Sequence, residues 1–236
     1  MVNQAAPQPP AVQPDVWLFD LDNTLYPVRC NLFAQTDRRM GEYISRLLDV
    51  HYDDAKLMQK EYWRKHGTTL RGLMLEHRIE PTEFLDYVHD IDYAPVDASP
   101  LLDAALGRLG GRKIVFTNGT VQHATRVLER LGVSHHFEAI YDIVAAAYIP
   151  KPEMSVYRDV VERYGLEPAR AAMLDDIAAN LKPAHELGMK TVWIRTPESV
   201  QRVAGQALDH VHHQADDLVE WLHEWLDGRP AAVVAG

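Results

Sequence analysis

The sequence predicts an α/β fold, a doubly wound parallel sheet of the Rossmann-like kind, with an all-helical cap inserted after the first strand. Short apolar runs alternate with segments whose apolar residues have helical spacing. Such alternation indicates βαβ units and a parallel sheet covered by helices on both faces. One stretch, residues 29–95, breaks the alternation and shows helical patterns alone.

Five apolar runs are predicted as strands, followed by a weaker sixth. They lie at 15–20 (DVWLFD), 112–118 (RKIVFTN), 139–144 (AIYDIV), 171–176 (AAMLDD) and 190–195 (KTVWIR), with the weaker run at 211–214. Helices are predicted between them at 100–109, 121–131, 153–164 and 178–187. Gly132 stands directly after the second of these helices, where a glycine commonly ends a helix.

The segment 29–95 is predicted to contain four helices. Their apolar residues are Leu32, Met40, Tyr43, Ile44, Leu47 and Leu48, then Leu57, Met58 and Tyr62, then Leu70, Leu73 and Met74, and finally Phe84, Leu85 and Val88. Pro81 suits the first turn of the fourth helix. The predicted domains are a core of residues 15–28 and 96–226, a cap of residues 29–95, and disordered tails at 1–14 and 227–236.

Composition narrows the classes of function. The 236 residues are 47% hydrophobic and 25% charged, as in a soluble globular protein. Cys30 is the only cysteine, which excludes an intrachain disulfide and favours a reducing compartment. A net charge of -10 without a basic cluster argues against nucleic acid as a partner, and no apolar run is long enough to span a bilayer. With no signal-peptide pattern at its start, a cytoplasmic monomer or homodimer acting on a small molecule is expected.

Residues able to do chemistry follow several of the predicted strands. They are Asp20 and Asp22, Thr117 and Asn118, Lys151 between two prolines, and Asp175 and Asp176. In open α/β sheets, ligands bind beyond the carboxyl ends of the strands, so these side chains are expected to form one site. Carboxylates placed so close repel one another, and a divalent cation together with the lysine would offset their charge.

These four groups of residues, in this order along the chain, resemble the motifs of the haloacid dehalogenase-like (HAD) hydrolase superfamily. They stand here as Asp20-Leu21-Asp22-Asn23-Thr24, Thr117-Asn118, Lys151 and Asp175-Asp176. The resemblance implies that Asp20 is a nucleophile that forms an aspartyl phosphate, and that Asp22 donates a proton to the leaving group and then activates water.

The same resemblance implies the binding groups. Thr117, Asn118 and Lys151 would bind the phosphate. Mg²⁺ would be held by Asp20, the backbone carbonyl of Asp22, and the acidic pair, with Asp176 as a direct ligand and Asp175 as a direct or water-mediated one.

An aspartate at position 22 favours phosphate esters, because dehalogenases of the superfamily typically lack it. Several stretches also resemble the pyrimidine 5'-nucleotidase-like branch: residues 25–27 (LYP), 66–70 (HGTTL), 87–93 (YVHDIDY), the FTNG turn and 187–193 (LGMKTVW). The expected function is therefore a magnesium-dependent phosphatase of nucleoside 5'-monophosphates of the UMP or CMP type.

Other functions stay open. One is a phosphatase of sugar phosphates or phosphoglycolate, and another is a phosphomutase. A dehalogenase and a non-catalytic binding protein fit the motifs less well. The cap turn Gly67-Thr68-Thr69 either reads the nucleoside or is a capped turn between helices.

Overall fold

The computed structural model describes residues 13–228 and contains a six-stranded parallel sheet. The strands are β1 (Val16–Phe19), β2 (Arg112–Phe116), β3 (Ala139–Tyr141), β4 (Ala171–Asp175), β5 (Lys190–Ile194) and β6 (His213–Ala215). Their order is β3-β2-β1-β4-β5-β6, and every neighbouring pair is parallel. The predicted fold class is confirmed. The predicted tails fall almost entirely outside the described residues.

The first strand lies at the centre of the sheet. Val16 is in register with Arg112 of β2 on one side and with Ala171 of β4 on the other. All strands of a parallel sheet end at the same edge, so the residues that follow β1, β2 and β4 become neighbours. Asp20 and Asp176, which are far apart in the sequence, come together in this way.

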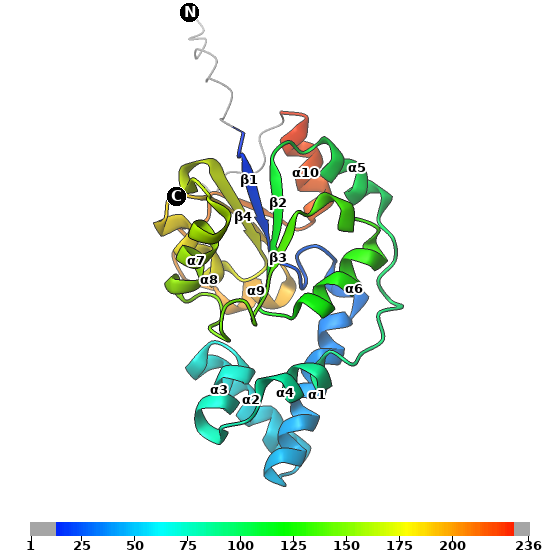
Figure 1. The fold of residues 1–236 in the computed structure, drawn as a ribbon, viewed down its shortest axis with the longest axis vertical. Helices are drawn as coiled ribbons and strands as arrows, with labels where there is room; N and C mark the ends of the chain where they lie inside the picture. The colour runs from blue at the N-terminus through cyan, green and yellow to red at the C-terminus, as the bar shows by residue number, and fades with distance from the viewer. Residues whose placement is uncertain (1–12, 229–236) are drawn as a thin grey trace, which may run out of the picture.

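Helices cover both faces of the sheet. Helices α5 (Pro100–Arg108), α6 (Val121–Leu131) and α10 (Leu218–Leu226) pack on one face, and α7 (Met154–Tyr164) and α8 (Ala178–Glu186) pack on the other (Figure 1). Side chains alternate along β1: Trp17 and Phe19 face the first group, whereas Val16 and Leu18 face the second. All four are buried, so β1 reads as a continuous apolar run.

The cap consists of α1 (Leu32–Leu48), α2 (Tyr52–His66), α3 (Thr69–His77) and α4 (Pro81–Val88). These helices lie beyond the carboxyl ends of the strands (Figure 1). They share an apolar cluster of their own, built around Ile44, Leu73 and Phe84. Pro81 occupies the first turn of α4, as its sequence position predicts.

Two features differ from the sequence prediction. Strand β3 ends at Tyr141 rather than at residue 144, because the side chain of Asp142 accepts hydrogen bonds from the backbone N–H groups of Val121 (2.9 Å) and Ala145 (2.8 Å) and turns the chain. Helices α9 (Pro197–Arg202) and α10 were not predicted. Among the helices of residues 13–228, none combines the length and the apolar character needed to cross a membrane.

Candidate active site

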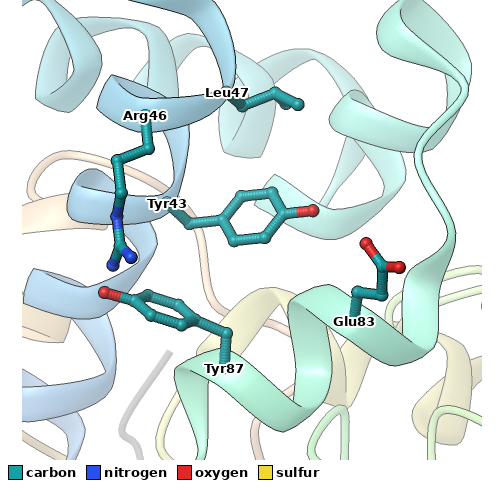
Figure 2. Close-up of a pocket in the computed structure, with 5 residues that line it drawn as sticks. All are labelled: Tyr43, Arg46, Leu47, Glu83 and Tyr87. Atoms are coloured by element: carbon teal, nitrogen blue, oxygen red, sulfur yellow. The ribbon is translucent and has the colours of Figure 1, made fainter.

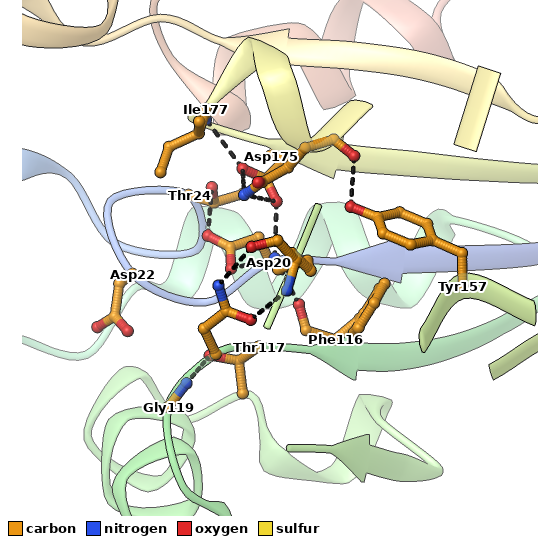
Figure 3. A network of polar contacts seen from close by, with 12 residues as sticks. Asp20, Asp22, Thr24, Phe116, Thr117, Gly119, Tyr157, Asp175 and Ile177 are labelled. Atoms are coloured by element: carbon orange, nitrogen blue, oxygen red, sulfur yellow. Dashed lines mark hydrogen bonds and ion pairs between the residues drawn. The ribbon is translucent and has the colours of Figure 1, made fainter. Parts of the chain in front are cut away.

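The carboxyl ends of β1, β2 and β4 come together at Asp20, Phe116 and Asp175 (Figure 3). The ammonium group of Lys151 lies between these three residues. Lys151 Nζ donates to Asp20 Oδ1 at 2.7 Å, to Asp175 Oδ2 at 2.7 Å and to the carbonyl oxygen of Phe116 at 2.9 Å. Its side chain is only 1% exposed. Burial alone would lower the pKa of Lys151, but the charges of Asp175 and Asp20 outweigh burial and raise this pKa above its usual value.

Asn118 holds the loop that carries this lysine. Its Oδ1 accepts from the backbone N–H of Lys151 at 2.8 Å, and its Nδ2 donates to the carbonyl oxygen of Lys151 at 3.4 Å. The family resemblance implied only phosphate binding for Asn118. The side chain thus has a second use, joining the end of β2 to the lysine loop.

The two adjacent aspartates after β4 have different surroundings. Asp175 is saturated: its Oδ1 accepts from Ile177 N at 2.9 Å, Asn180 Nδ2 lies 3.0 and 3.1 Å from its two oxygens, and its Oδ2 receives Lys151. Asn180 is itself fixed by Tyr157, whose hydroxyl donates to the backbone carbonyl oxygen of Asn180 at 2.5 Å. Within residues 13–228, no hydrogen bond or ion pair reaches the carboxylate of Asp176, although this residue is only 8% exposed.

Carboxylate oxygens of Asp20, Asp175 and Asp176 lie within 4.8 Å of one another. Burial raises the pKa of Asp20 to about 7, with Lys151 opposing the rise and Asp175 adding to it. Burial also raises the pKa of Asp176 well above its usual value, and the nearby charges of Asp20 and Asp175 contribute. An all-oxygen set that includes a buried carboxylate without a protein donor fits a hard divalent cation such as Mg²⁺.

Asp22 points away from this cluster (Figure 3). Its Oδ1 accepts from the hydroxyl of Tyr26 at 2.5 Å and from Nε2 of His123 at 2.8 Å. Burial alone would raise the pKa of Asp22, but His123 and Tyr26 lower it to about 2. Sequence reasoning missed both partners. A tyrosine four residues after Asp22 was a local clue, whereas His123 carried none.

Thr117 is buried at the end of β2, and its Oγ1 accepts from the backbone N–H of Gly119 at 2.9 Å. This contact shapes the turn that leads into α6, whose N-cap is Thr120. Thr117 is therefore not itself the N-cap of α6. Phosphate binding by Thr117 and Asn118 stays a prediction.

The cap lies closed on the core. Arg71 of α3 forms an ion pair with Glu153 at 3.3 Å, and the guanidinium of Arg202 lies 4.6 Å from the ring centre of Trp63 in α2. Ile143, from the loop after β3, belongs to the apolar cluster of the cap. A Cβ added at Gly67 would stand 3.4 Å from Cγ of Pro150, so the turn after α2 touches the lysine loop. These contacts place α2 and α3 against the core beside the lysine loop.

The turn after α2 is a capped turn. Thr68 Oγ1 accepts from the backbone N–H of Arg71 at 3.2 Å, as the N-cap of α3, and Thr69 is buried. Both threonines are therefore used in the structure of the cap, which favours the structural interpretation over nucleoside reading.

Two surface hollows lie outside the carboxylate cluster. One of about 310 Å³ on the cap, between α1 and α4, is lined by Tyr43, Arg46, Leu47, Glu83 and Tyr87 (Figure 2). The guanidinium of Arg46 stacks 4.3 Å from the ring centre of Tyr87. The other, about 530 Å³, is lined by the segment that joins β1 to α1 together with residues from 95–99, 194–197 and 216–219. Neither is lined by Asp20, Lys151 or Asp176.

Comparison with known proteins agrees with this geometry. The family model of the haloacid dehalogenase-like hydrolases matches residues 14–188, which is most of the chain. The chain therefore belongs to the haloacid dehalogenase-like hydrolases. This is the same superfamily that the sequence motifs resemble.

Individual relatives are distant. The chain is 26% identical over 196 residues to phosphate metabolism protein 8 of Saccharomyces cerevisiae, covering 74% of this chain and 59% of that protein. It is 25% identical over 228 residues to the N-acetylmuramic acid 6-phosphate phosphatase of Pseudomonas aeruginosa, covering 89% of this chain and 92% of that one. The structure of CbbY from Rhodobacter sphaeroides, in complex with xylulose-1,5-bisphosphate, aligns with a TM-score of 0.65 at 17% identity, over 89% of this chain and 96% of that chain, which supports the fold.

Replacing Lys151 by methionine is expected to lower kcat by at least tenfold, about 1.4 kcal/mol of barrier. It is also expected to destabilise the metal-free protein by about 3–5 kcal/mol, because two buried carboxylates lose their counter-charge. Enzyme assays and urea unfolding in chelator measure the two effects. Lys182→Met, at an exposed lysine of α8, is the matched control. An unchanged stability of the Lys151 variant would contradict the proposed charge balance.

Stability is expected to fall as the pH is lowered below about 6.5, because of His89. Burial, with the nearby charge of His123 as the next cause, lowers the pKa of His89 to about 3. Between pH 3 and 6.5 the unfolded chain binds a proton at this histidine and the folded chain does not. Protonation of His89 therefore costs no stability above pH 6.5. Between pH 6.5 and pH 3 it lowers the free energy of unfolding progressively, by up to about 1.4 kcal/mol per pH unit.

Urea unfolding at pH 7 and pH 5 measures this loss. His89→Phe keeps a ring stacked on His123 (centres 4.5 Å apart) and removes the titrating group. Asp22 and Arg126 also face His89 and are unchanged in the variant. The variant is expected to lose less stability than the wild type by on the order of 1–2 kcal/mol, whereas His51→Asn, at an exposed histidine, behaves as wild type. Equal losses in all three proteins would refute the assignment.

Proposed function

We propose that this chain is a magnesium-dependent phosphatase of small phosphate monoesters that works through an aspartyl phosphate on Asp20. The observation that carries the proposal is that Asp20 pairs with the buried ammonium group of Lys151 and also lies beside the buried carboxylate of Asp176, which has no hydrogen-bond or ion-pair partner among residues 13–228. Such an arrangement suits a reaction in which charge on a transferring phosphoryl group must be balanced. Asp22, two residues on, supplies the acid and base that an ester needs and a halide does not.

The proposed reaction has two steps, and Asp22 acts in both. A carboxylate oxygen of Asp20 attacks phosphorus while the bond to the ester oxygen breaks and Asp22 gives its proton to that oxygen. Water then attacks phosphorus, its proton passes to Asp22, and the bond between Asp20 and phosphorus breaks. Lys151 stabilises negative charge throughout. Thr117 and the backbone N–H of Asn118 bind phosphate oxygens.

The cation site is assigned to Asp20, the backbone carbonyl of Asp22 and Asp176. Asp175 is already saturated by Lys151, Asn180 and Ile177, so it acts through a water molecule or by holding the lysine. Bound Mg²⁺ would supply positive charge for the phosphoryl oxygens. Its presence would also lower the raised pKa values of Asp20 and Asp176 and so favour the ionised nucleophile.

A bound phosphate also changes the state of Asp22. With a pKa of about 2, Asp22 is ionised in the closed protein without substrate. A phosphate dianion placed beside it would raise this pKa by charge repulsion, which allows Asp22 to carry the proton that the leaving group takes.

For the substrate, we propose nucleoside 5'-monophosphates of the UMP or CMP type, on the stretches that resemble the pyrimidine 5'-nucleotidase-like branch. Sugar phosphates are the second candidate, favoured by the relative named for N-acetylmuramic acid 6-phosphate, of which this chain covers 92%. The closed cap supports a small substrate in both cases, because a macromolecular phosphate does not fit beneath α2 and α3. A cytoplasmic monomer or homodimer stays the expected form.

Phosphate release from a panel of esters tests the proposal. UMP, CMP, N-acetylmuramic acid 6-phosphate, ribose 5-phosphate and phosphoglycolate are compared by kcat/KM, with UMP and CMP expected to rank first. Asp20→Asn, nearly isosteric, is expected to lose on the order of 10³-fold or more while remaining folded by circular dichroism. A folded Asp20→Asn protein that retains near wild-type rates would contradict the proposed mechanism. A higher rank for sugar phosphates would overturn the nucleotide assignment alone.

Removal of the cation is expected to abolish phosphate release. Excess EDTA should stop turnover, and added Mg²⁺ should restore it, because three buried carboxylates lie within 4.8 Å of one another and the ammonium group of Lys151 pairs with only two of them, Asp20 and Asp175. Mg²⁺ should also raise the unfolding temperature of wild type, and Asp176→Asn should reduce that rise. Turnover that persists in EDTA would contradict the dependence on a cation.

A further inference from the structure

The general acid of the proposed reaction, Asp22, is held by one residue near it in sequence and by one far from it. Both hydrogen bonds to the Asp22 carboxylate, from Tyr26 Oη and His123 Nε2, go to the same oxygen, Oδ1. A carboxylate only accepts, so Nε2 of His123 carries the hydrogen. One oxygen of Asp22 is therefore anchored twice.

The other oxygen of Asp22 faces the expected phosphate side. A Cβ added at Gly119 would lie 3.7 Å from Asp22 Oδ2 and 3.3 Å from Thr117 Oγ1. Oδ2 and the threonine hydroxyl thus flank the same small space at the end of β2, which a larger residue than glycine would fill. Anchoring Oδ1 directs Oδ2 into that space.

His123 cannot turn its ring freely. Its side chain is 1% exposed, and its Nδ1 lies 2.9 Å from the hydroxyl of Tyr93. The ring of His89 stacks on it with centres 4.5 Å apart, and His89 Nδ1 lies 3.3 Å from Thr120 Oγ1. Tyr93 and His89 belong to the segment that returns from the cap to α5. The orientation of His123, and through it that of Asp22, is therefore fixed by the junction between cap and core.

We propose that His123 is a positioning residue that aims Oδ2 of Asp22 at the leaving oxygen of the substrate, with Tyr93 holding the imidazole in place. This inference rests on the phosphatase function proposed above. As an oxygen of Asp20 bonds to phosphorus, the bond between phosphorus and the ester oxygen breaks, and the electron pair of that bond goes to the ester oxygen. The ester oxygen takes the proton from Oδ2 of Asp22, which is left as a carboxylate. Without His123, the hydrogen bond from Tyr26 is the one remaining anchor of the Asp22 carboxylate. The carboxylate can then rotate, and proton transfer becomes less efficient.

The dependence on the leaving group separates this role from a structural one. An alkyl ester such as ribose 5-phosphate needs the proton, because an alkoxide is a poor leaving group, whereas p-nitrophenolate leaves without it. The parameter kcat/KM reports steps only as far as phosphorylation of Asp20, which excludes the later attack of water. His123→Phe, which keeps the stacked ring, is expected to lower kcat/KM for ribose 5-phosphate by on the order of 10²-fold and to change that for p-nitrophenyl phosphate by no more than about twofold.

Two further variants and one control sharpen the test. His123→Gln, whose amide can donate to Asp22, is expected to recover most of the loss, and Tyr93→Phe to show a smaller loss with the same selectivity for ribose 5-phosphate. These two keep the test valid if His123→Phe does not fold. His136→Phe, at a histidine bonded to Asp103 far from the site, should leave both esters unaffected.

Equal losses for both esters in His123→Phe, or no loss for either, would overturn the positioning role. The wild-type values judge the proposed function separately. A wild type that releases phosphate from no ester overturns that function and, with it, the role of His123, whereas an active wild type with unselective variants overturns the role of His123 alone.

Discussion

The ammonium group of Lys151 is the contact on which the rest of the site depends. It lies 2.7 Å from carboxylate oxygens of both Asp20 and Asp175 and 2.9 Å from the carbonyl oxygen that ends β2. Three strand ends with carboxylates and a carbonyl would otherwise repel one another in a dry environment. The sheet can therefore bring these groups together only because the chain also delivers a cation to the same point.

The structure gives two aspartates of the same motif opposite properties. Asp20 is buried beside other carboxylates, and its pKa rises to about 7. Asp22 receives two hydrogen bonds on one oxygen, and its pKa falls to about 2. Position in the motif does not set these values, since both residues leave the same strand. Their partners do: a cluster of like charges for the first, and a histidine and a tyrosine for the second. A nucleophile and a proton carrier need such different surroundings.

Features that depend on local pattern were predictable from the sequence. Apolar runs such as VWLF placed the strands to within a few residues, and the order of Asp20, Thr117, Lys151 and Asp175 placed the site at the carboxyl edge. Features that depend on tertiary contact were not. His123 lies 101 residues from its partner Asp22, and nothing near it in sequence marks the contact. The difference between saturated Asp175 and unpartnered Asp176 likewise comes from Asn180 and the lysine loop, which only the fold brings near.

The insertion of the cap has a consequence for how the chain folds. Strand β1 ends at residue 19, but its partners begin at residues 112 and 171. Helices α1 to α4 lie between them and pack mainly on one another. Contacts between distant residues form slowly because a long loop must close first. During synthesis β1 therefore stays without its neighbouring strands until residues 112–116 and 171–175 have been made, whereas the cap helices between them can already associate. The nucleophile that follows β1 acquires its charged neighbours only once Lys151 and Asp175 are present.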